Sequence, residues 1–105
     1  MTRPANAARG EAMLLVGGAR LRLRPSFEAL IAAEDELGSL FALVERAAEG
    51  RLQLAEIAAL FWHCVADRPE DCTRARIGAA MVEGGLAGAT PVLRLLLTQI
   101  LQGRV

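Results

Sequence analysis

Few residue types in this chain could do chemistry. The single histidine, His63, is followed directly by Cys64, and Cys72 lies eight residues later. Neighbouring side chains on a helix point about 100° apart, so His63 and Cys64 cannot act on each other as base and nucleophile. Asp71 would add another metal-ligand type, but the spacing matches no metal or redox motif. We therefore expect no metal, no cofactor and, in a cytoplasmic protein, no disulfide.

Three consecutive acids are the other chemical candidate: Glu34, Asp35 and Glu36. In a helix, successive side chains spread around the axis, which does not pair carboxylates for acid–base catalysis. Glu34 falls on the apolar stripe of its segment, so we expect it to be partly solvated or paired with an arginine. The candidate partners are Arg20, Arg22, Arg74 and Arg76. Nothing here builds a catalytic site, and the chain is not predicted to be an enzyme.

The balance of charges argues against two classes of partner. Twelve acids stand against twelve basic residues, all of them arginine, so the formal net charge is zero. Binding to nucleic acid or to an anionic membrane usually needs a basic excess on one face. No apolar run reaches the ~18 residues of a membrane span, and the first residues lack the apolar core of a signal peptide. We expect a cytoplasmic protein with neither nucleic acid nor membrane as a partner.

Length and periodicity predict one α+β domain. A chain of 105 residues that is 53% hydrophobic can bury a core without disulfides or metal. Residues 1–10 are polar and aperiodic and are expected to be a disordered tail, followed by a single domain over 11–105. The expected elements are a two-stranded hairpin at 11–24, packed on four to five short helices at about 26–37, 39–49, 54–66, 73–82 and 90–102.

The hairpin is predicted from a glycine pair, Gly17-Gly18, between two apolar runs. Two-residue hairpin turns need positive φ, which glycine adopts without strain. This turn sets the register, and the pairs on one side are all apolar. They are Val16 with Ala19, Leu14 with Leu21, and Ala12 with Leu23. We expect this side to dock on the helices, because an isolated hairpin is marginal in water.

The other side of the hairpin carries mixed residues. Met13 and Leu15 pair with Arg22 and Arg20, and Glu11 pairs with Arg24. One interpretation is a solvated face with two exposed apolar side chains. The other is a contact surface for a protein partner, which a free strand edge would favour. On the second interpretation the binding residues are Met13, Leu15, Arg20 and Arg22.

The segment 26–37 is predicted to organise the fold, because it joins the β half to the α half. Ser26 is a typical helix cap after Pro25, and Gly38 is a typical stop. Phe27, Leu30, Ile31 and Leu37 recur at helical spacing and predict one buried stripe, on which Glu34 also lies.

The last helix is apolar on most of its circumference. Thr90 and Pro91 predict its cap and first residue, with some structure from Leu86 leading into it. A helix this apolar is either central to the core or shared with another chain. Leu96, Leu97 and Ile100 are therefore candidates for either role.

The order of features resembles the gene transfer agent family, prophage-derived tail proteins grouped with tail assembly chaperones and also labelled tail tube proteins. The resemblance covers roughly residues 9–102. Its best block is Phe-Glu-Ala-Leu-Ile-Ala-Ala-Glu-Asp-Glu-Leu-Gly-Ser-Leu, with Ala-Glu-Gly-Arg-Leu at 48–52 and Gly-Leu-Ala at 85–87. It implies a non-enzymatic role in virion assembly in a bacterium, with the tape-measure protein and the major tail protein as partners.

Three interpretations of function stay open. A tail assembly chaperone that binds the tape-measure protein agrees best with the surplus of apolar surface. A structural, tube-associated tail subunit is the nearest alternative, although two short strands offer little material for a β-ring. A small DNA-binding regulator is the third, because the helices at 54–66 and 73–82 resemble a helix-turn-helix in spacing. Self-association into a homo-oligomer is compatible with all three.

Overall fold

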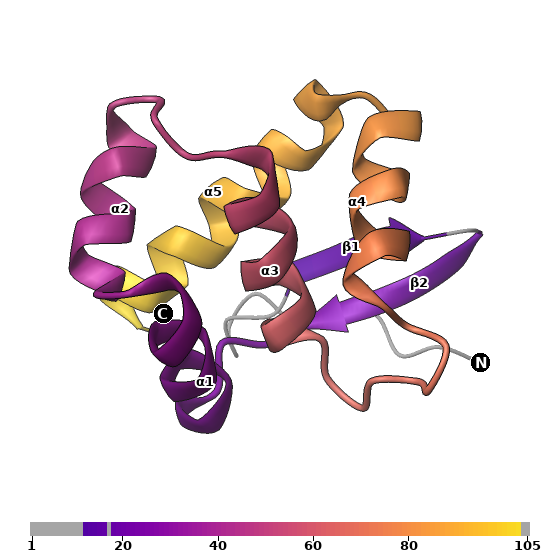
Figure 1. Cartoon of the computed structure of the whole chain (residues 1–105), viewed down its shortest axis with the longest axis horizontal. Coiled ribbons are helices and arrows are strands. Elements are labelled where there is room, and N and C mark those ends of the chain that lie inside the picture. The colour runs from indigo at the N-terminus through magenta and orange to yellow at the C-terminus, as the bar shows by residue number, and fades with distance from the viewer. Residues whose placement is uncertain (1–11, 17, 104–105) are drawn as a thin grey trace.

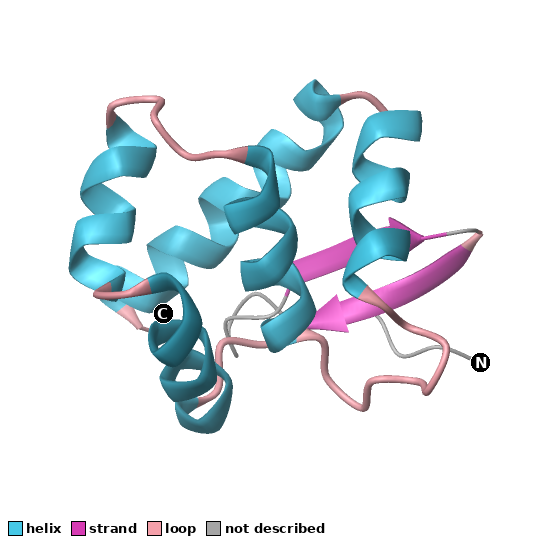
Figure 2. Cartoon of the chain, viewed as in Figure 1, coloured by secondary structure: helices cyan, strands magenta, loops and turns pink. Residues whose placement is uncertain are grey.

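A two-stranded hairpin and five helices follow one another along the chain (Figures 1 and 2). The computed structural model describes residues 12–16 and 18–103, so the expected tail at 1–10 lies outside the described residues. The elements are β1 (Ala12–Val16), β2 (Ala19–Leu23), α1 (Phe27–Leu37), α2 (Leu40–Ala48), α3 (Leu54–Cys64), α4 (Arg74–Glu83) and α5 (Leu86–Gln102). The predicted α+β class, with an N-terminal hairpin packed on helices, is confirmed.

The hairpin has the register that the sequence predicts. Leu14 pairs with Leu21, Met13 with Arg22, and the end pairs follow in step. Four residues of the docking side are buried: Ala12, Leu14, Val16 and Leu23. Gly18 has φ +82°, as a primed turn requires, whereas Gly17 and Glu11 lie outside the described residues. The alternation of leucine and arginine in β2, together with the register that the turn sets, therefore indicates which face meets the core.

Helix α3 lies at the centre of the core. It packs against α1 on one side and α4 on the other, and both α4 and α5 pack on β1 (Figure 1). Its residues Leu60, Phe61 and Cys64 are almost completely buried. The chain after α3 also closes onto β2, because the N–H of Ala66 donates to the carbonyl of Arg22 at 2.8 Å. The hairpin is thus fixed to the helices by hydrogen bonds as well as by apolar contact.

Helix α1 begins and ends where predicted, but it is rotated from the expected orientation. Ser26 Oγ accepts from the N–H of Ala29 at 3.2 Å, and Gly38 ends the helix with φ +84°. The expected buried stripe is wrong for Phe27, which is 76% exposed, and for Ile31, which is also exposed. Ala33 is the buried residue instead. A small side chain at this position lets α1 approach α3 closely, and this packing, not the size of the apolar residues, decides which side faces inward.

Of the two alternatives for Glu34, solvation holds and pairing with an arginine is wrong, because no arginine among the described residues pairs with it. Its Oε2 accepts a hydrogen bond from the backbone N–H of Leu40 at 3.1 Å. The proposed arginine partners bind other groups: Arg22 pairs with Asp67, Arg74 with Glu36, and Arg76 with Asp71. Arg20 is exposed on β2. Glu34 is itself exposed to solvent, so it needs no buried counter-ion.

Helix α5 begins at Leu86, five residues before Pro91, so Thr90 is not its cap. Gly85 precedes the helix with φ +82°. Proline inside a helix removes one backbone donor and crowds the carbonyl four residues earlier. Here the extra turn buries Ala89, and Thr90 Oγ1 bonds back to the carbonyl of Leu86 at 3.3 Å. Packing of this first turn against β1 and α4 offsets the local penalty.

Candidate protein-binding groove

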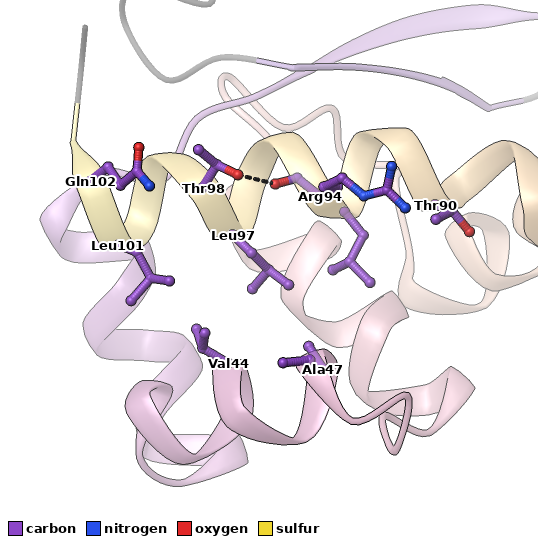
Figure 3. A pocket seen from close by; sticks show the side chains of 10 residues that line it. Val44, Ala47, Thr90, Arg94, Leu97, Thr98, Leu101 and Gln102 are labelled. Atoms are coloured by element: carbon purple, nitrogen blue, oxygen red, sulfur yellow. Dashed lines mark hydrogen bonds between the residues drawn. The ribbon is translucent and has the colours of Figure 1, made fainter.

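Helices α2 and α5 are separated by a groove with a volume of about 410 Å³ (Figure 3). Its floor is apolar and its far side carries polar side chains. The lining residues are Val44, Ala47 and Ala48 from α2, and Thr90, Leu93, Arg94, Leu97, Thr98, Leu101 and Gln102 from α5. We call this feature the α2–α5 groove.

The contribution of α5 follows from helical spacing. Residues four apart form neighbouring rows along a helix surface. Leu93, Leu97 and Leu101 make one such row and form the floor, while Thr90, Arg94, Thr98 and Gln102 make the next row and form the rim. Thr98 Oγ1 donates to the carbonyl of Arg94 at 2.8 Å, which satisfies the hydroxyl within the helix. The groove therefore presents an apolar strip bordered by a polar strip.

Two polar contacts position α2 as the other wall. At its start, the N–H of Leu40 is bound by Glu34 of α1. Near its end, Arg46 Nη2 lies 2.7 Å from Glu56 Oε2 of α3. Hydrogen bonds from Arg46 and from the backbone of Gln53 hold the pKa of Glu56 below its usual value. Leu40 and Leu43 anchor the inner face of α2 in the core.

A smaller hollow of about 220 Å³ continues the groove past Val44 and Leu101, which line both. Its other lining residues are Leu30, Glu34, Leu40, Phe41 and Ile100. Phe41 is 75% exposed and Leu101 is 54% exposed. On α1, the exposed Phe27 and Ile31 lie on the same helical stripe as Glu34. Phe41 and Leu101 thus place two exposed apolar side chains at one end of the groove, an arrangement typical of an interaction surface.

The residues predicted to bind a partner do not lie in one place. Leu97 lines the α2–α5 groove and Ile100 lines the smaller hollow. Leu96 is completely buried, so it belongs to the core and is not accessible to a partner. The same helix therefore contributes one residue to the core and others to the lining of the groove and the smaller hollow.

Met13 and Leu15 line a separate hollow of about 250 Å³ between the hairpin and α4–α5. Leu15 is 62% exposed, Arg20 is exposed, and Arg22 Nη2 lies 3.1 Å from Asp67 Oδ2. The structure does not bring the hairpin residues together with Leu97 and Ile100. Sequence reasoning missed Phe41 and Arg94 as surface candidates. Nothing in their local pattern distinguishes them from ordinary helix residues.

The one histidine takes part in a polar cluster that ties three helices together. His63 Nε2 of α3 lies 2.9 Å from Glu36 Oε1 of α1, and Arg74 Nη1 of α4 lies 2.5 Å from Glu36 Oε2. Two hydrogen bonds lower the pKa of Glu36: the one with His63 has the larger effect and the one with Arg74 the smaller. The guanidinium carbons of Arg68 and Arg74 lie 3.6 and 4.6 Å from the ring centre of Trp62. The charged and aromatic side chains of this cluster are paired with one another, so we assign the cluster a structural role.

The two cysteines are buried free thiols. Burial raises the pKa of Cys64 to about 12 and also raises that of Cys72, which disfavours the reactive thiolate. Within residues 12–16 and 18–103, no group of three or more His, Cys, Asp or Glu side chains is arranged to hold a metal ion. Among the helices described, none has the length and apolar character that crossing a membrane requires.

Comparison with known proteins identifies the family. Residues 9–103 match the family described as "Phage tail tube protein, GTA-gp10". The chain belongs to this family. The resemblance to gene transfer agent and phage tail proteins is therefore confirmed, and a role in a phage-type tail follows, with other tail proteins as partners. The family description names tail proteins. No curated protein and no solved structure matches the chain.

Proposed function

We propose that this protein is a tail assembly chaperone that binds the tape-measure protein through the α2–α5 groove. The observation that carries the proposal is the open apolar floor of Leu93, Leu97 and Leu101, in a chain that belongs to a phage tail family. A chaperone needs an apolar surface that a partner covers for a time. On this proposal it acts in the bacterial cytoplasm, before the tail is complete.

The exposed side chains support transient binding. Phe41 and Phe27 each leave about three quarters of their surface in water. Burying apolar surface is worth roughly 25 cal/mol per Å², so covering Phe41 and Leu101 would contribute several kcal/mol before the costs of association. The polar rim would keep the free protein soluble.

A structural tail subunit is the alternative that the family description favours. A tube ring generally needs extensive β-sheet, and the described residues form a single two-stranded sheet. This supports the chaperone, although the hairpin surface at Met13 and Leu15 would serve a subunit contact equally well. DNA binding has less support, because Arg68, Arg74 and Arg76 near the α3–α4 turn are engaged by Trp62, Glu36 and Asp71.

The experiment is co-expression with the tape-measure protein, followed by affinity purification and light scattering. The chaperone proposal expects co-purification, with solubility of the long partner depending on this chain. Assembly of this protein alone into rings or tubes would show a structural subunit instead. Major tail protein serves as a second bait, because a tube-associated subunit would bind it and leave the tape-measure protein unbound.

A further inference from the structure

We propose that the α2–α5 groove takes an amphipathic helix of the partner, with a carboxylate that meets Arg94 and a basic residue that meets Glu34. This inference rests on the proposed function for the source of the helix, the tape-measure protein. It adds the secondary structure of the bound segment and the order of its charges.

A helix fits the groove better than a strand does. Both walls are helices, whose mid-helix N–H and carbonyl groups are already paired, so a strand would find no backbone partners there. The row of Leu93, Leu97 and Leu101 is instead a ridge at i, i+4 spacing, the kind that interdigitates with the ridges of a second helix. The bound segment should therefore present apolar residues at i, i+3 or i+4, and i+7.

The length of the site sets the length of the segment. Thr90 and Gln102 mark the two ends of the lining on α5. Twelve residues of helix rise about 18 Å, so about three turns of a partner helix would fill the groove. The smaller hollow beyond Leu101 would accept one further apolar side chain, next to Phe41 and Ile100.

Arg94 provides a positive charge at the rim. It is exposed, and no hydrogen bond or ion pair joins its guanidinium to another described residue. By contrast, Arg46 on the facing helix is already bound to Glu56 at 2.7 Å. A carboxylate on the bound helix would thus meet Arg94 without displacing an existing partner.

Glu34 provides a negative charge at the other end. Its Oε2 accepts from the N–H of Leu40, but no cation among the described residues pairs with it. Arg94 precedes Leu101 by seven residues, about 10 Å along α5, and Glu34 lies beyond Leu101 in the smaller hollow. The acid and the base of the bound helix should therefore be two or more turns apart, and this charge order gives the groove a direction.

The test uses the full chain and synthetic helical segments of the tape-measure protein, with affinity measured by calorimetry. Arg94→Glu should weaken binding by about tenfold, as expected for loss of a charge contact and its reversal. Arg51→Glu is the matched control, because Arg51 is exposed and outside the groove. It should change affinity by less than about twofold. A segment whose acid is changed to arginine should recover affinity for Arg94→Glu.

Two further variants test the location of the site and the role of its negative charge separately. Leu101→Asp places a charge on a half-exposed floor residue and should abolish binding, with an unchanged circular dichroism spectrum. Glu34→Gln keeps an oxygen for the N–H of Leu40 but removes the charge, and should weaken binding about threefold.

Each outcome has a defined meaning. If segments bind the wild type and Leu101→Asp equally, the groove is not the site, and the inference fails together with the assignment of the groove, while the role as a tape-measure chaperone stands. Equal effects of Arg94→Glu and Arg51→Glu would overturn the charge order. If no part of the tape-measure protein binds, the proposed function fails. A stable dimer that Leu101→Asp disrupts would show that a second copy covers the groove, which also overturns the inference.

Discussion

Glu34 Oε2 of α1 accepts a hydrogen bond from the backbone N–H of Leu40 at 3.1 Å, so the last turn of one helix caps the first turn of the next. A negative charge at a helix N-terminus also interacts favourably with the helix dipole. Ser39 Oγ binds the N–H of Ala42 at 3.3 Å and completes the cap. This short connection sets the angle of α2, and α2 forms one wall of the α2–α5 groove.

Removing this cap should destabilise the fold modestly. Glu34→Ala deletes the acceptor and should lower the free energy of unfolding by about 1 kcal/mol, typical for a helix cap. Glu34→Gln should lose less, because its amide oxygen can still accept from Leu40. Urea denaturation of the two variants measures the difference. Equal losses would mean that the charge, and not the hydrogen bond, provides the stabilisation.

The two glycines at Gly38 and Gly78 should respond in opposite directions to alanine. Gly38 has φ +84°, a conformation that costs an L-residue about 1–3 kcal/mol, so Gly38→Ala should destabilise the protein. Gly78 lies within α4, and an added Cβ would meet nothing within 4 Å. Gly78→Ala should therefore stabilise by about 0.5–1 kcal/mol. Thermal denaturation followed by circular dichroism tests both, and a loss of stability in Gly78→Ala would contradict the argument.

Leu96 and Leu97 are neighbours with different roles. Leu96 is completely buried, so Leu96→Ala should cost about 2–5 kcal/mol, and Leu96→Asp should prevent folding. Leu97 is half-buried at the groove floor. Leu97→Ala should therefore reduce stability less than Leu96→Ala does, and should weaken binding to a partner more. Urea denaturation and partner pull-down, applied to both alanine variants, separate the two effects. A folded Leu96→Asp protein would show that the core assignment is wrong.

Stability should depend on pH through Glu36. Its pKa is lowered from 4.5 in the folded protein by hydrogen bonds from His63 and Arg74, so the folded state favours the carboxylate. The stabilisation is complete above about pH 4.5 and is lost as the pH falls through the lowered folded value. The advantage of the wild type over Glu36→Gln should therefore shrink as the pH falls below about 4.5 and through the lowered folded pKa. Asp35→Asn is the control, and the same pH dependence in both variants would exclude Glu36 as the cause.

Local chemistry in the sequence was enough to predict the hairpin register and most helix starts. The glycine turn sets the register, and Leu21 and Leu23 alternate with arginines, so that one face of the hairpin is apolar. Ser26, Ser39 and Thr73 each accept a backbone N–H at the start of a helix, as their side chains favour. These features depend on contacts within a few residues, which the order of residues specifies directly.

The candidate site depends on packing between elements that are distant in sequence. The spacing of Phe27 and Ile31 is the same whether their stripe faces the core or the solvent. In the structure Ala33 is the residue of α1 that packs into the core, so Phe27 and Ile31 face the solvent. In the same way, α5 could be read as apolar all round, but only the placement of α2 made Leu97 a groove residue and left Leu96 in the core. The sequence determined the elements and their apolar rows. The tertiary structure decided which rows stay open to a partner, because burial is a property of the neighbours and not of the residue alone.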